Sequence, residues 1–170
     1  IKEPADVNLL KVALLRTDLV VDAIFGTGFH GAVQGVAAGV IQMINAFDQL
    51  PVLAADIPSG VQADTGQVEN VAVQASATVT FAWGKPGLFL APGSEYAGEV
   101  EVADIALPYE LLDEERRRLQ YLDAAFCKKW LKVRRQESHK GDFGHVLILG
   151  GSRNMTGAPI MAAKGAIAAG

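Results

Sequence analysis

The pattern of apolar and polar positions predicts a strand–helix–strand unit near the start of the chain. An apolar run occupies residues 19–25, and a glycine-rich turn follows at residues 26–31. Apolar positions at helical spacing then predict a helix over residues 33–47, and a second apolar run covers residues 51–55. Short Val- and Ile-rich runs that alternate with helices are typical of parallel strands buried on both faces. We therefore predict an α/β fold with polar residues at the carboxyl ends of its strands, where open sheets of this kind bind ligands.

Further segments predict that the sheet continues toward an edge. Residues 71–83 contain β-branched and aromatic side chains and predict a strand, and residues 98–103 predict a shorter one. The lead-in at residues 8–16 fits a short helix or a strand. Lys85, in the turn after the longer strand, fits either a group that neutralises a phosphate or an ordinary solvated lysine.

The second half of the chain has a different character. Residues 109–120 are charged and helix-prone, and we interpret them as a solvated connector with helical ion pairs. Asp123 is placed to cap a helix over residues 124–131, in which Trp130 is predicted as a packing anchor. An apolar strand at residues 146–149, a glycine turn and an alanine-rich helix then repeat the strand–turn–helix order, without the Gly-Lys-Ser/Thr ending of a P-loop.

The glycine-rich turn predicts a nucleotide site. Its sequence, Gly26-Thr27-Gly28-Phe29-His30-Gly31, fits the pattern Gly-x-Gly-x-x-Gly. Glycines let a backbone approach a phosphate closely, and the helix that follows presents free N–H groups to the anion. Asp56, at the end of the next predicted strand, stands where a dinucleotide-binding fold places its ribose-binding acid. The alternative is a tight turn whose glycines serve packing alone.

Two oxygen-bearing positions do not suit an ordinary dinucleotide-binding fold. Asp22 lies inside the first apolar run, where a carboxylate is costly to bury without a partner or a cation. Asp56 and Ser59 share the proline-stiffened turn Asp56-Ile57-Pro58-Ser59-Gly60. Oxygen donors from two strand ends suit a hard cation better than zinc or copper. The alternative for Asp22 is that it caps a helix or accepts backbone hydrogen bonds.

The composition is that of a soluble globular protein and excludes several function classes. The 170 residues are 50% hydrophobic and 20% charged, and a net charge of −4 without a long basic block argues against nucleic acid as the main partner. The single cysteine, Cys127, excludes an intrachain disulfide framework. No apolar run is long enough for a membrane span and no signal peptide is visible, so we predict a cytoplasmic protein without a membrane partner. The chain begins with Ile1 and stops inside a helical segment, so we expect a fragment of a longer protein.

Four stretches, which together cover most of the chain, carry a resemblance to a known family. They are residues 22–28 (DAIFGTG), 56–60 (DIPSG) with 63–66 (ADTG), 78–81 (TVTF) with 85–88 (KPGL), and 139–145 (HKGDFGH) running into 150–152 (GGS). With these motifs the chain resembles the NAD(P)H-hydrate repair enzymes. Members of the bacterial family join two enzymes in one polypeptide. The first domain epimerises the R and S forms of hydrated NADH or NADPH, and the second dehydrates the S form with ADP as phosphoryl donor.

The resemblance implies two α/β domains. Residues 1–108 would form the C-terminal part of a Rossmann-like parallel-sheet epimerase domain, and residues 109–137 a helical linker. Residues 138–170 would form the N-terminal start of a ribokinase-like dehydratase domain. The family's loop with another potassium ligand would precede residue 1, and the dehydratase's nucleotide site and catalytic aspartate would follow residue 170. Whether these residues fold or act alone stays open, as does the preference for NADH or NADPH.

The resemblance also implies roles for individual residues. Asp22 and Ser59 match positions that bind a potassium ion, Asp56 matches a substrate-contacting acid, and Ala158 matches a substrate contact of the dehydratase domain. The substrate-binding loop corresponds to Gly26, Thr27, Gly28, Phe29, His30, Gly31 and Ala32. The implied cofactors are potassium and, for the dehydratase, ADP and Mg²⁺ at sites mostly beyond residue 170. The implied partner is a small molecule, hydrated NADH or NADPH, and the family suggests a homo-oligomer.

Asp56 is the candidate catalytic residue. In hydrated NADH, water has added at C6 of the nicotinamide ring, and epimerisation requires that C–O bond to break and reform on the other face. A carboxylate near C6 would shuttle the proton as general acid and base, while the ring nitrogen assists departure of the hydroxyl. No role is assigned to His139, Lys140 or His145.

Two other functions stay open. The first is a non-catalytic nucleotide-binding or scaffold module with an epimerase-like fold, and the second domain counts against it. The other is an NAD-dependent dehydrogenase, which rests on the glycine-rich turn alone. Asp22 and the turn from Asp56 to Ser59 count against that function.

Overall fold

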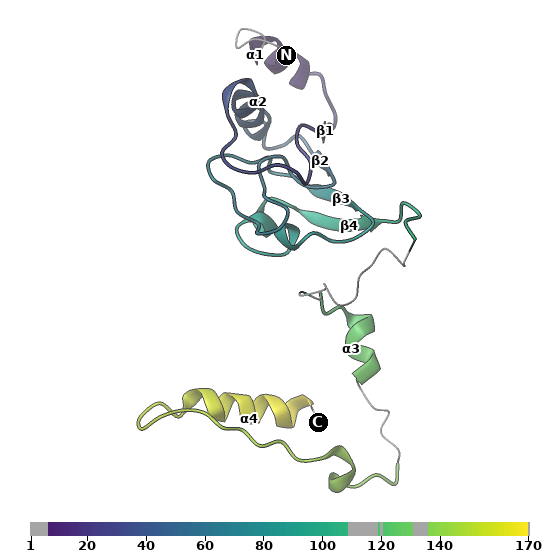
Figure 1. Cartoon of the computed structure of the whole chain (residues 1–170), viewed down its shortest axis with the longest axis vertical. Coiled ribbons are helices and arrows are strands. Elements are labelled where there is room, and N and C mark those ends of the chain that lie inside the picture. Colours follow the sequence, from purple (N-terminus) through teal and green to yellow (C-terminus); the bar gives the residue numbers. More distant parts are fainter. Residues whose placement is uncertain (1–6, 109–118, 120, 131–135, 170) are drawn as a thin grey trace. The chain divides into compact units, whose positions relative to one another are not determined.

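The structure is a computed structural model that describes residues 7–108, 119, 121–130 and 136–169 (Figure 1). The chain divides into two compact units, unit 1 with residues 1–119 and unit 2 with residues 120–170. Most of the predicted charged connector lies outside the described residues, so its helical character stays a prediction.

Unit 1 is built on a four-stranded parallel sheet. The strands β1 (Val20–Asp22), β2 (Val52–Ala55), β3 (Ala77–Phe81) and β4 (Glu99–Ala103) lie side by side in chain order (Figure 1). Asp22 pairs in register with Ala54, and Ala55 pairs with Val79. Because parallel strands end at the same edge of a sheet, the turns after β1, β2 and β3 come together there. The predicted α/β class is confirmed.

A helical layer covers one face of this sheet. Helix α2 (Gly35–Asn45) connects β1 to β2, and helix α1 (Val7–Leu14) contacts α2. The core between them consists of Leu14, Val33, Ile41, Ile44, Val52 and Val73. Burial of such side chains contributes about 1.5–3 kcal/mol each, which fixes the helices on the sheet. The lead-in is therefore a helix and not a strand.

The opposite face of the sheet differs from the prediction of strands buried on both faces. Along β2, buried positions alternate with partly exposed ones. Val20 of β1 packs against the core, whereas Val21 is 59% exposed. Successive side chains of a strand point to opposite faces. The helices described in unit 1 thus cover the face of Val20 and Val52 only.

Strand β1 is shorter than the apolar run at residues 19–25 predicts. It ends at Asp22. Beyond it, the backbone amides of Ile24 and Phe25 donate to side-chain oxygens and not to a neighbouring strand. Short polar side chains compete with a strand ladder for backbone donors, so the strand stops at its first carboxylate.

Strand β3 occupies only part of the predicted strand at residues 71–83. Before it, the Asn45 side chain at the end of α2 donates to the carbonyl of Ala72 (2.8 Å) and accepts from the amide of Gln74 (3.0 Å). These bonds satisfy the backbone without a strand partner, so the first half of the segment is an irregular link. Strand β4 agrees with the prediction at residues 98–103.

A second, smaller core holds the turn after β2 against the segment that follows β3. It consists of Ile57, Val61, Ala63, Ala72, Leu88 and Ala97, and the short helices η2 (Pro86–Leu88) and η3 (Gly93–Glu95) contact each other beside it. At Gly60 the φ angle is +101°, and an added Cβ would lie 2.3 Å from the Val71 carbonyl oxygen. This turn therefore requires glycine at position 60.

Unit 2 contains helix α3 (Ala124–Trp130), the short helix η6 (Lys140–Phe143) and helix α4 (Gly157–Ala169). Asp123 accepts a hydrogen bond from the amide of Phe126 at 2.6 Å, which confirms it as the cap of the predicted helix. Trp130 is 76% exposed in the described structure, so its prediction as a packing anchor is wrong there. Its ring lies 6.2 Å from the Phe126 ring between centroids, and this contact buries little of it.

The strand predicted at residues 146–149 does not form in the described part of unit 2. Val146, Leu147 and Leu149 are 75%, 82% and 86% exposed there. A strand needs a neighbour for its backbone N–H and C=O groups. The described part of unit 2 offers one isolated bridge, between Ser152 and Met155, so the apolar run has nothing to pair with. Helix α4 does follow the glycine turn, as predicted.

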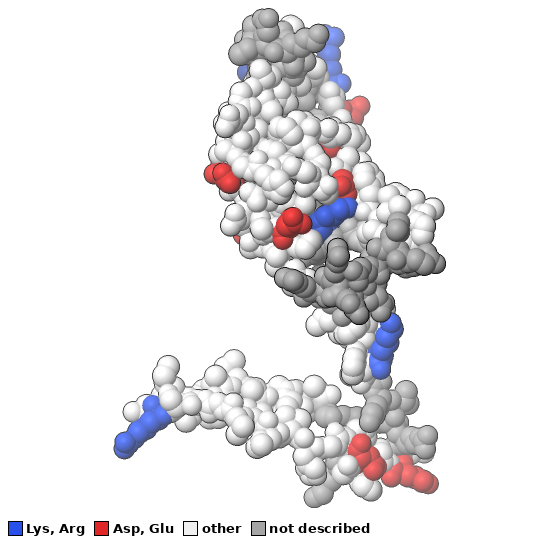
Figure 2. Space-filling model, viewed as in Figure 1, with Lys and Arg blue, Asp and Glu red and all other residues white. Residues whose placement is uncertain are grey.

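The surface of the described residues carries its charges in a scattered manner. Figure 2 shows Lys, Arg, Asp and Glu side chains singly or in small groups on the face in view. Cys127 is an exposed free thiol on α3. Among the residues that the structure describes, no helix combines the length and the apolarity needed to cross a membrane.

Candidate functional site

Asp22 and Ser59 meet where β1 and β2 end. Asp22 Oδ2 accepts from the Ser59 amide at 2.7 Å, and Asp22 Oδ1 accepts from Ser59 Oγ, also at 2.7 Å. Each residue is 1% exposed. The turn after β2 brings Ser59 to the end of β1 because the two strands pair in parallel. Two residues far apart in the chain thus form one buried cluster of oxygens.

The same cluster holds the start of the glycine-rich loop. The Ile24 amide donates to Asp22 Oδ1 at 3.2 Å, and the Phe25 amide donates to Ser59 Oγ at 2.9 Å. The Phe25 carbonyl oxygen lies 3.5 Å from Ser59 Oγ. The alternative that Asp22 accepts backbone hydrogen bonds is therefore confirmed.

The donor set of this cluster fits a hard cation. It combines a carboxylate, a hydroxyl and the carbonyl oxygen of Phe25. Within the described residues, no basic side chain pairs with Asp22, and a buried carboxylate is stabilised by a countercharge. Oxygen-only donors favour alkali and alkaline-earth ions. No group of three or more His, Cys, Asp or Glu side chains suited to a metal occurs in the described part of the chain, so a cation here would depend on hydroxyl and carbonyl oxygens.

The loop from Gly26 to Ala32 follows directly and is largely exposed. The Phe29 amide donates to the Gly26 carbonyl at 3.1 Å, and the Phe25 and Phe29 rings stack with centroids 4.7 Å apart. An added Cβ at Gly26 or Gly28 would meet no atom within 4 Å. Packing within the described chain therefore does not account for these two glycines.

The loop leads into α2 along a path fixed by one asparagine. Asn70 accepts from the Val33 amide at 2.9 Å and donates to the Val33 carbonyl at 2.8 Å. Helix α2 then begins at Gly35, and Gln34 before it makes no side-chain cap. The first N–H groups of a helix and its dipole attract anions. The loop therefore leads into a helix whose first N–H groups have no side-chain cap, and its role as a nucleotide site stays a prediction.

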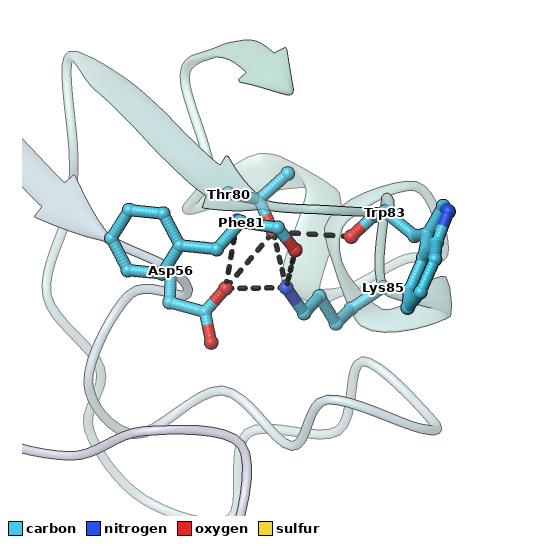
Figure 3. A network of polar contacts seen from close by, with 5 residues as sticks. All are labelled: Asp56, Thr80, Phe81, Trp83 and Lys85. Carbon is cyan, nitrogen blue, oxygen red and sulfur yellow. Dashed lines mark hydrogen bonds and ion pairs between the residues drawn. The ribbon is translucent and has the colours of Figure 1, made fainter. Parts of the chain in front are cut away.

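Asp56 lies at the end of β2 in a left-handed backbone conformation, with φ of +72°. Its amide donates to the Val79 carbonyl at 2.8 Å. Its Oδ1 accepts from the Phe81 amide at 3.1 Å and from Thr80 Oγ1 at 3.2 Å, and it forms an ion pair with Lys85 Nζ (Figure 3). The carboxylate is therefore held by the end of β3 and by the turn that follows it.

The surroundings of Asp56 favour its charged form. Burial alone raises the pKa of Asp56. The hydrogen bond from Lys85, the Phe81 amide, the Lys85 charge and the Thr80 hydroxyl together outweigh burial and hold the pKa below the usual aspartate value. Asp56 is therefore a carboxylate at neutral pH, suited to accept a proton or a hydrogen bond from a ligand.

Lys85 has a partner that the sequence does not predict. It is neither a solvated lysine nor a free cation, because its ammonium group pairs with Asp56 and its side chain is 19% exposed. Thr80, which also contacts Asp56, was not identified from the sequence either. A signal did exist: β2 and β3 were predicted as successive strands, and parallel pairing puts the end of β3 beside Asp56.

The remaining predicted residues lie outside this constellation. Ala158 belongs to the first turn of α4 in unit 2, and its role as a substrate contact stays a prediction. His139 accepts from the Gly141 amide at 3.1 Å, and Asp142 accepts from the His139 amide at 2.9 Å, so this histidine caps η6. His145 is exposed.

The sequence is similar to curated proteins named "Bifunctional NAD(P)H-hydrate repair enzyme Nnr". The chain is 48% identical to the protein from Moorella thermoacetica, 44% to that from Thermofilum pendens and 36% to that from Escherichia coli, over 94%, 90% and 90% of this chain. These matches cover 30%, 28% and 29% of the relatives, so the chain spans less than a third of their length.

The fold and a family model agree with this similarity. The crystal structure of yeast ynu0, YNL200c, matches with a TM-score of 0.50 over 64% of this chain and 44% of that chain. At 19% identity, this match supports the α/β fold alone. The family model described as "YjeF-related protein N-terminus" matches residues 1–87, which include Asp22, the glycine loop, Asp56 and Ser59. The chain therefore belongs to the family of the YjeF-related protein N-terminus.

Proposed function

We propose that the full-length protein repairs hydrated NADH and NADPH, by epimerising their R and S forms and dehydrating the S form at the expense of ADP. The proposal is supported by 48% identity, over 94% of this chain, to a relative named for NAD(P)H-hydrate repair. The structural observation that carries the epimerase half is the Asp56 carboxylate. It stands in the same turn as Ser59, which holds the start of the glycine loop.

We assign the two activities to different parts of the polypeptide. Residues 1–108 belong to the C-terminal part of a Rossmann-like epimerase domain, and residues 109–137 link it to the next domain. Residues 138–170 begin a ribokinase-like dehydratase domain, whose ADP and Mg²⁺ sites lie mostly beyond residue 170. Ala158, at the start of α4, contacts the dehydratase substrate in this assignment. The word "bifunctional" in the relatives' name supports the division.

The glycine loop binds the substrate in this proposal. The space around Gly26 and Gly28, and the uncapped start of α2, suit a negatively charged phosphate group of hydrated NADH. Thr27 and His30 are exposed and offer hydrogen-bonding groups to the same ligand.

Potassium fits the buried cluster behind the loop. Asp22, Ser59 and the Phe25 carbonyl would hold it, because they supply the oxygen donors that an alkali cation prefers. When bound, the ion supplies a positive charge that balances the Asp22 carboxylate and the substrate phosphates. The residues themselves keep the loop start and the turn after β2 together.

Asp56 carries the proton in the proposed epimerisation. The electron pair of the ring nitrogen forms a C=N bond as the C6–O bond breaks, and the leaving hydroxide takes up a proton from solvent to become water. On the return, water adds to the other face of C6, the electron pair goes back to nitrogen, and a proton is released. The Asp56 carboxylate takes this proton and releases it to solvent, so Asp56 is ionised again at the start of the next cycle.

The test uses separated R and S hydrated NADH and the full-length gene product. The wild type is expected to interconvert the two forms without ADP, and to turn both into NADH with ADP. Asp56→Asn is expected to slow epimerisation at least about 100-fold while leaving conversion of the S form with ADP intact. Asp48→Asn, at an exposed position, serves as the matched control, and a protein-free sample gives the spontaneous rate.

Each component of the proposal has its own contrary result. Epimerisation by Asp56→Asn at the wild-type rate would remove Asp56 from the mechanism. Conversion of the S form alone by the wild type would make the N-terminal region a binding module. No conversion of either form with ADP would end the repair proposal.

A further inference from the structure

The ammonium group of Lys85 has all of its donors engaged inside the protein. Lys85 Nζ pairs with Asp56 Oδ1 and lies 2.9 Å from Thr80 Oγ1 and 2.8 Å from the Phe81 carbonyl oxygen. A lysine ammonium has three N–H donors. Lys85 therefore has none left for a substrate phosphate unless one of these bonds breaks.

The two carboxylate oxygens of Asp56 have different hydrogen-bonding environments. Oδ1 accepts from Lys85, from the Phe81 amide and from the Thr80 hydroxyl. No hydrogen bond from the described residues reaches Oδ2, and Figure 3 shows this second oxygen turned away from the network. One carboxylate oxygen is thus fixed, and the other is left for a ligand.

We infer that Lys85 is a positioning residue that holds Asp56 Oδ1 and presents Oδ2 of the carboxylate to a hydroxyl group of the substrate. The inference rests on the proposed function and deepens it. In this role Lys85 positions the proton acceptor, Asp56, and does not bind a phosphate. The inference also predicts the chemistry of the contact: Oδ2 accepts a hydrogen bond from an O–H donor, as on C6 of a hydrated nicotinamide.

The fold gives this arrangement its rigidity. Asp56 sits at the end of β2 with its amide bonded to Val79, while Thr80 and Phe81 end β3. Thr80 is fully buried, so the lysine is anchored on a core position. Lys85 is the charged group that acts on Asp56 among the described residues, and its effect on the Asp56 pKa is downward.

Lys85 therefore determines the pH range in which Asp56 can act as a proton acceptor. The proton acceptor works while Asp56 is ionised, so activity is lost as the pH falls through its pKa. Because Lys85 holds that pKa down, its removal moves the loss of activity to higher pH. If Lys85 instead bound a substrate phosphate, removing its side chain would raise KM and leave the pH dependence of activity unchanged.

The experiment measures kcat and KM for epimerisation of R hydrated NADH, without ADP, against pH in the full-length gene product. Lys85→Met is expected to shift the acidic limb of kcat/KM upward by about one pH unit or more, with activity recovering as the pH rises. Lys85→Gln, which keeps a hydrogen-bond donor but no charge, is expected to shift the acidic limb in the same direction. It replaces Lys85→Met in the experiment if that variant does not fold. Lys85→Arg is expected to restore most of the wild-type profile. Lys11→Met, at an exposed lysine on α1, is the matched control.

A second readout does not depend on activity. The side-chain carboxyl carbon of Asp56, labelled with carbon-13 and identified through its loss in Asp56→Asn, is titrated by NMR. It is expected to titrate at higher pH in Lys85→Gln than in the wild type. Equal titration in both proteins, or a raised KM with an unchanged pH profile, would overturn the role of Lys85 and leave the repair proposal standing. If the wild type does not epimerise, the proposed function fails, and the titration alone decides the role of Lys85.

Discussion

Two aspartates serve one edge of the sheet, and their surroundings give them different chemistry. Asp22 is 1% exposed and held by the amides of Ile24 and Ser59 and by the Ser59 hydroxyl. Asp56 keeps a 20% exposed side chain with one oxygen free of bonds from the described residues. The first therefore suits a structural or cation-binding role, and the second suits contact with a substrate.

Ser59→Ala tests the buried pair at the residue scale. The change removes the hydroxyl that donates to Asp22 and accepts from the Phe25 amide, so a buried charge loses a partner. The free energy of unfolding is expected to fall by about 2–3 kcal/mol, measured by urea unfolding of the full-length gene product. Ser94→Ala, at an exposed position, is expected to stay within about 0.5 kcal/mol of the wild type. Equal values for the two variants would show that the pair does not stabilise the fold.

At the scale of elements, two glycine turns have opposite reasons for their glycines. Gly28 has open space around its missing Cβ, whereas Gly60 is in a left-handed conformation with the Val71 carbonyl in the way. No neighbouring atom requires glycine at position 28, whereas Gly60 allows the backbone to turn. The sequence pattern alone does not separate these two cases.

Gly28→Ala is therefore expected to impair substrate binding, whereas Gly60→Ala is expected to impair stability. Gly28→Ala is expected to raise KM for hydrated NADH at least about tenfold, because the added methyl group occupies ligand space, with unfolding changed by less than about 1 kcal/mol. Gly60→Ala is expected to destabilise the protein by several kcal/mol, about the upper range for single changes. Steady-state kinetics and urea unfolding of both variants check this, and a Gly28→Ala enzyme with wild-type KM would argue against substrate at the loop.

Elements whose backbone partners lie within the described structure were predicted better than the run that has no partner there. Helix α2 and strands β2 and β4 lie where the apolar pattern puts them. The apolar run at residues 146–149 has strand composition, yet it stays exposed in the described structure because no neighbouring strand pairs with it. Strand formation depends on a partner, whereas a helix satisfies its own backbone.

At the scale of the whole molecule, the parallel order of the sheet assembles the site. The end of β1 contributes Asp22, the turn after β2 contributes Asp56 and Ser59, and the turn after β3 contributes Lys85. A cation bound at the end of β1 and the turn after β2 would connect them, so its binding energy would add to the stability of the whole unit.

Potassium is therefore expected to stabilise the full-length protein. Replacing tetramethylammonium chloride by potassium chloride at equal ionic strength should raise the free energy of unfolding by roughly 1 kcal/mol once potassium exceeds its Kd several-fold. Asp22→Asn is expected to remove this dependence, because the charged oxygen donor is lost. Thermal unfolding in both salts provides the measurement. A wild type indifferent to potassium would leave the cluster as a hydrogen-bonded tie between two turns.

The sequence by itself determined the α/β class, the glycine loop, and Asp22, Asp56 and Ser59 as polar groups at strand ends. It did so because the spacing of apolar residues, the turn residues, and carboxylates within or beside apolar runs are all visible in short stretches of sequence. Only the tertiary structure decided that Ser59 closes on Asp22, and that Lys85 and Thr80 hold one oxygen of Asp56. Those contacts join residues that are distant in the chain and are created by strand pairing. The pKa of Asp56 and the direction of its free oxygen follow from that pairing.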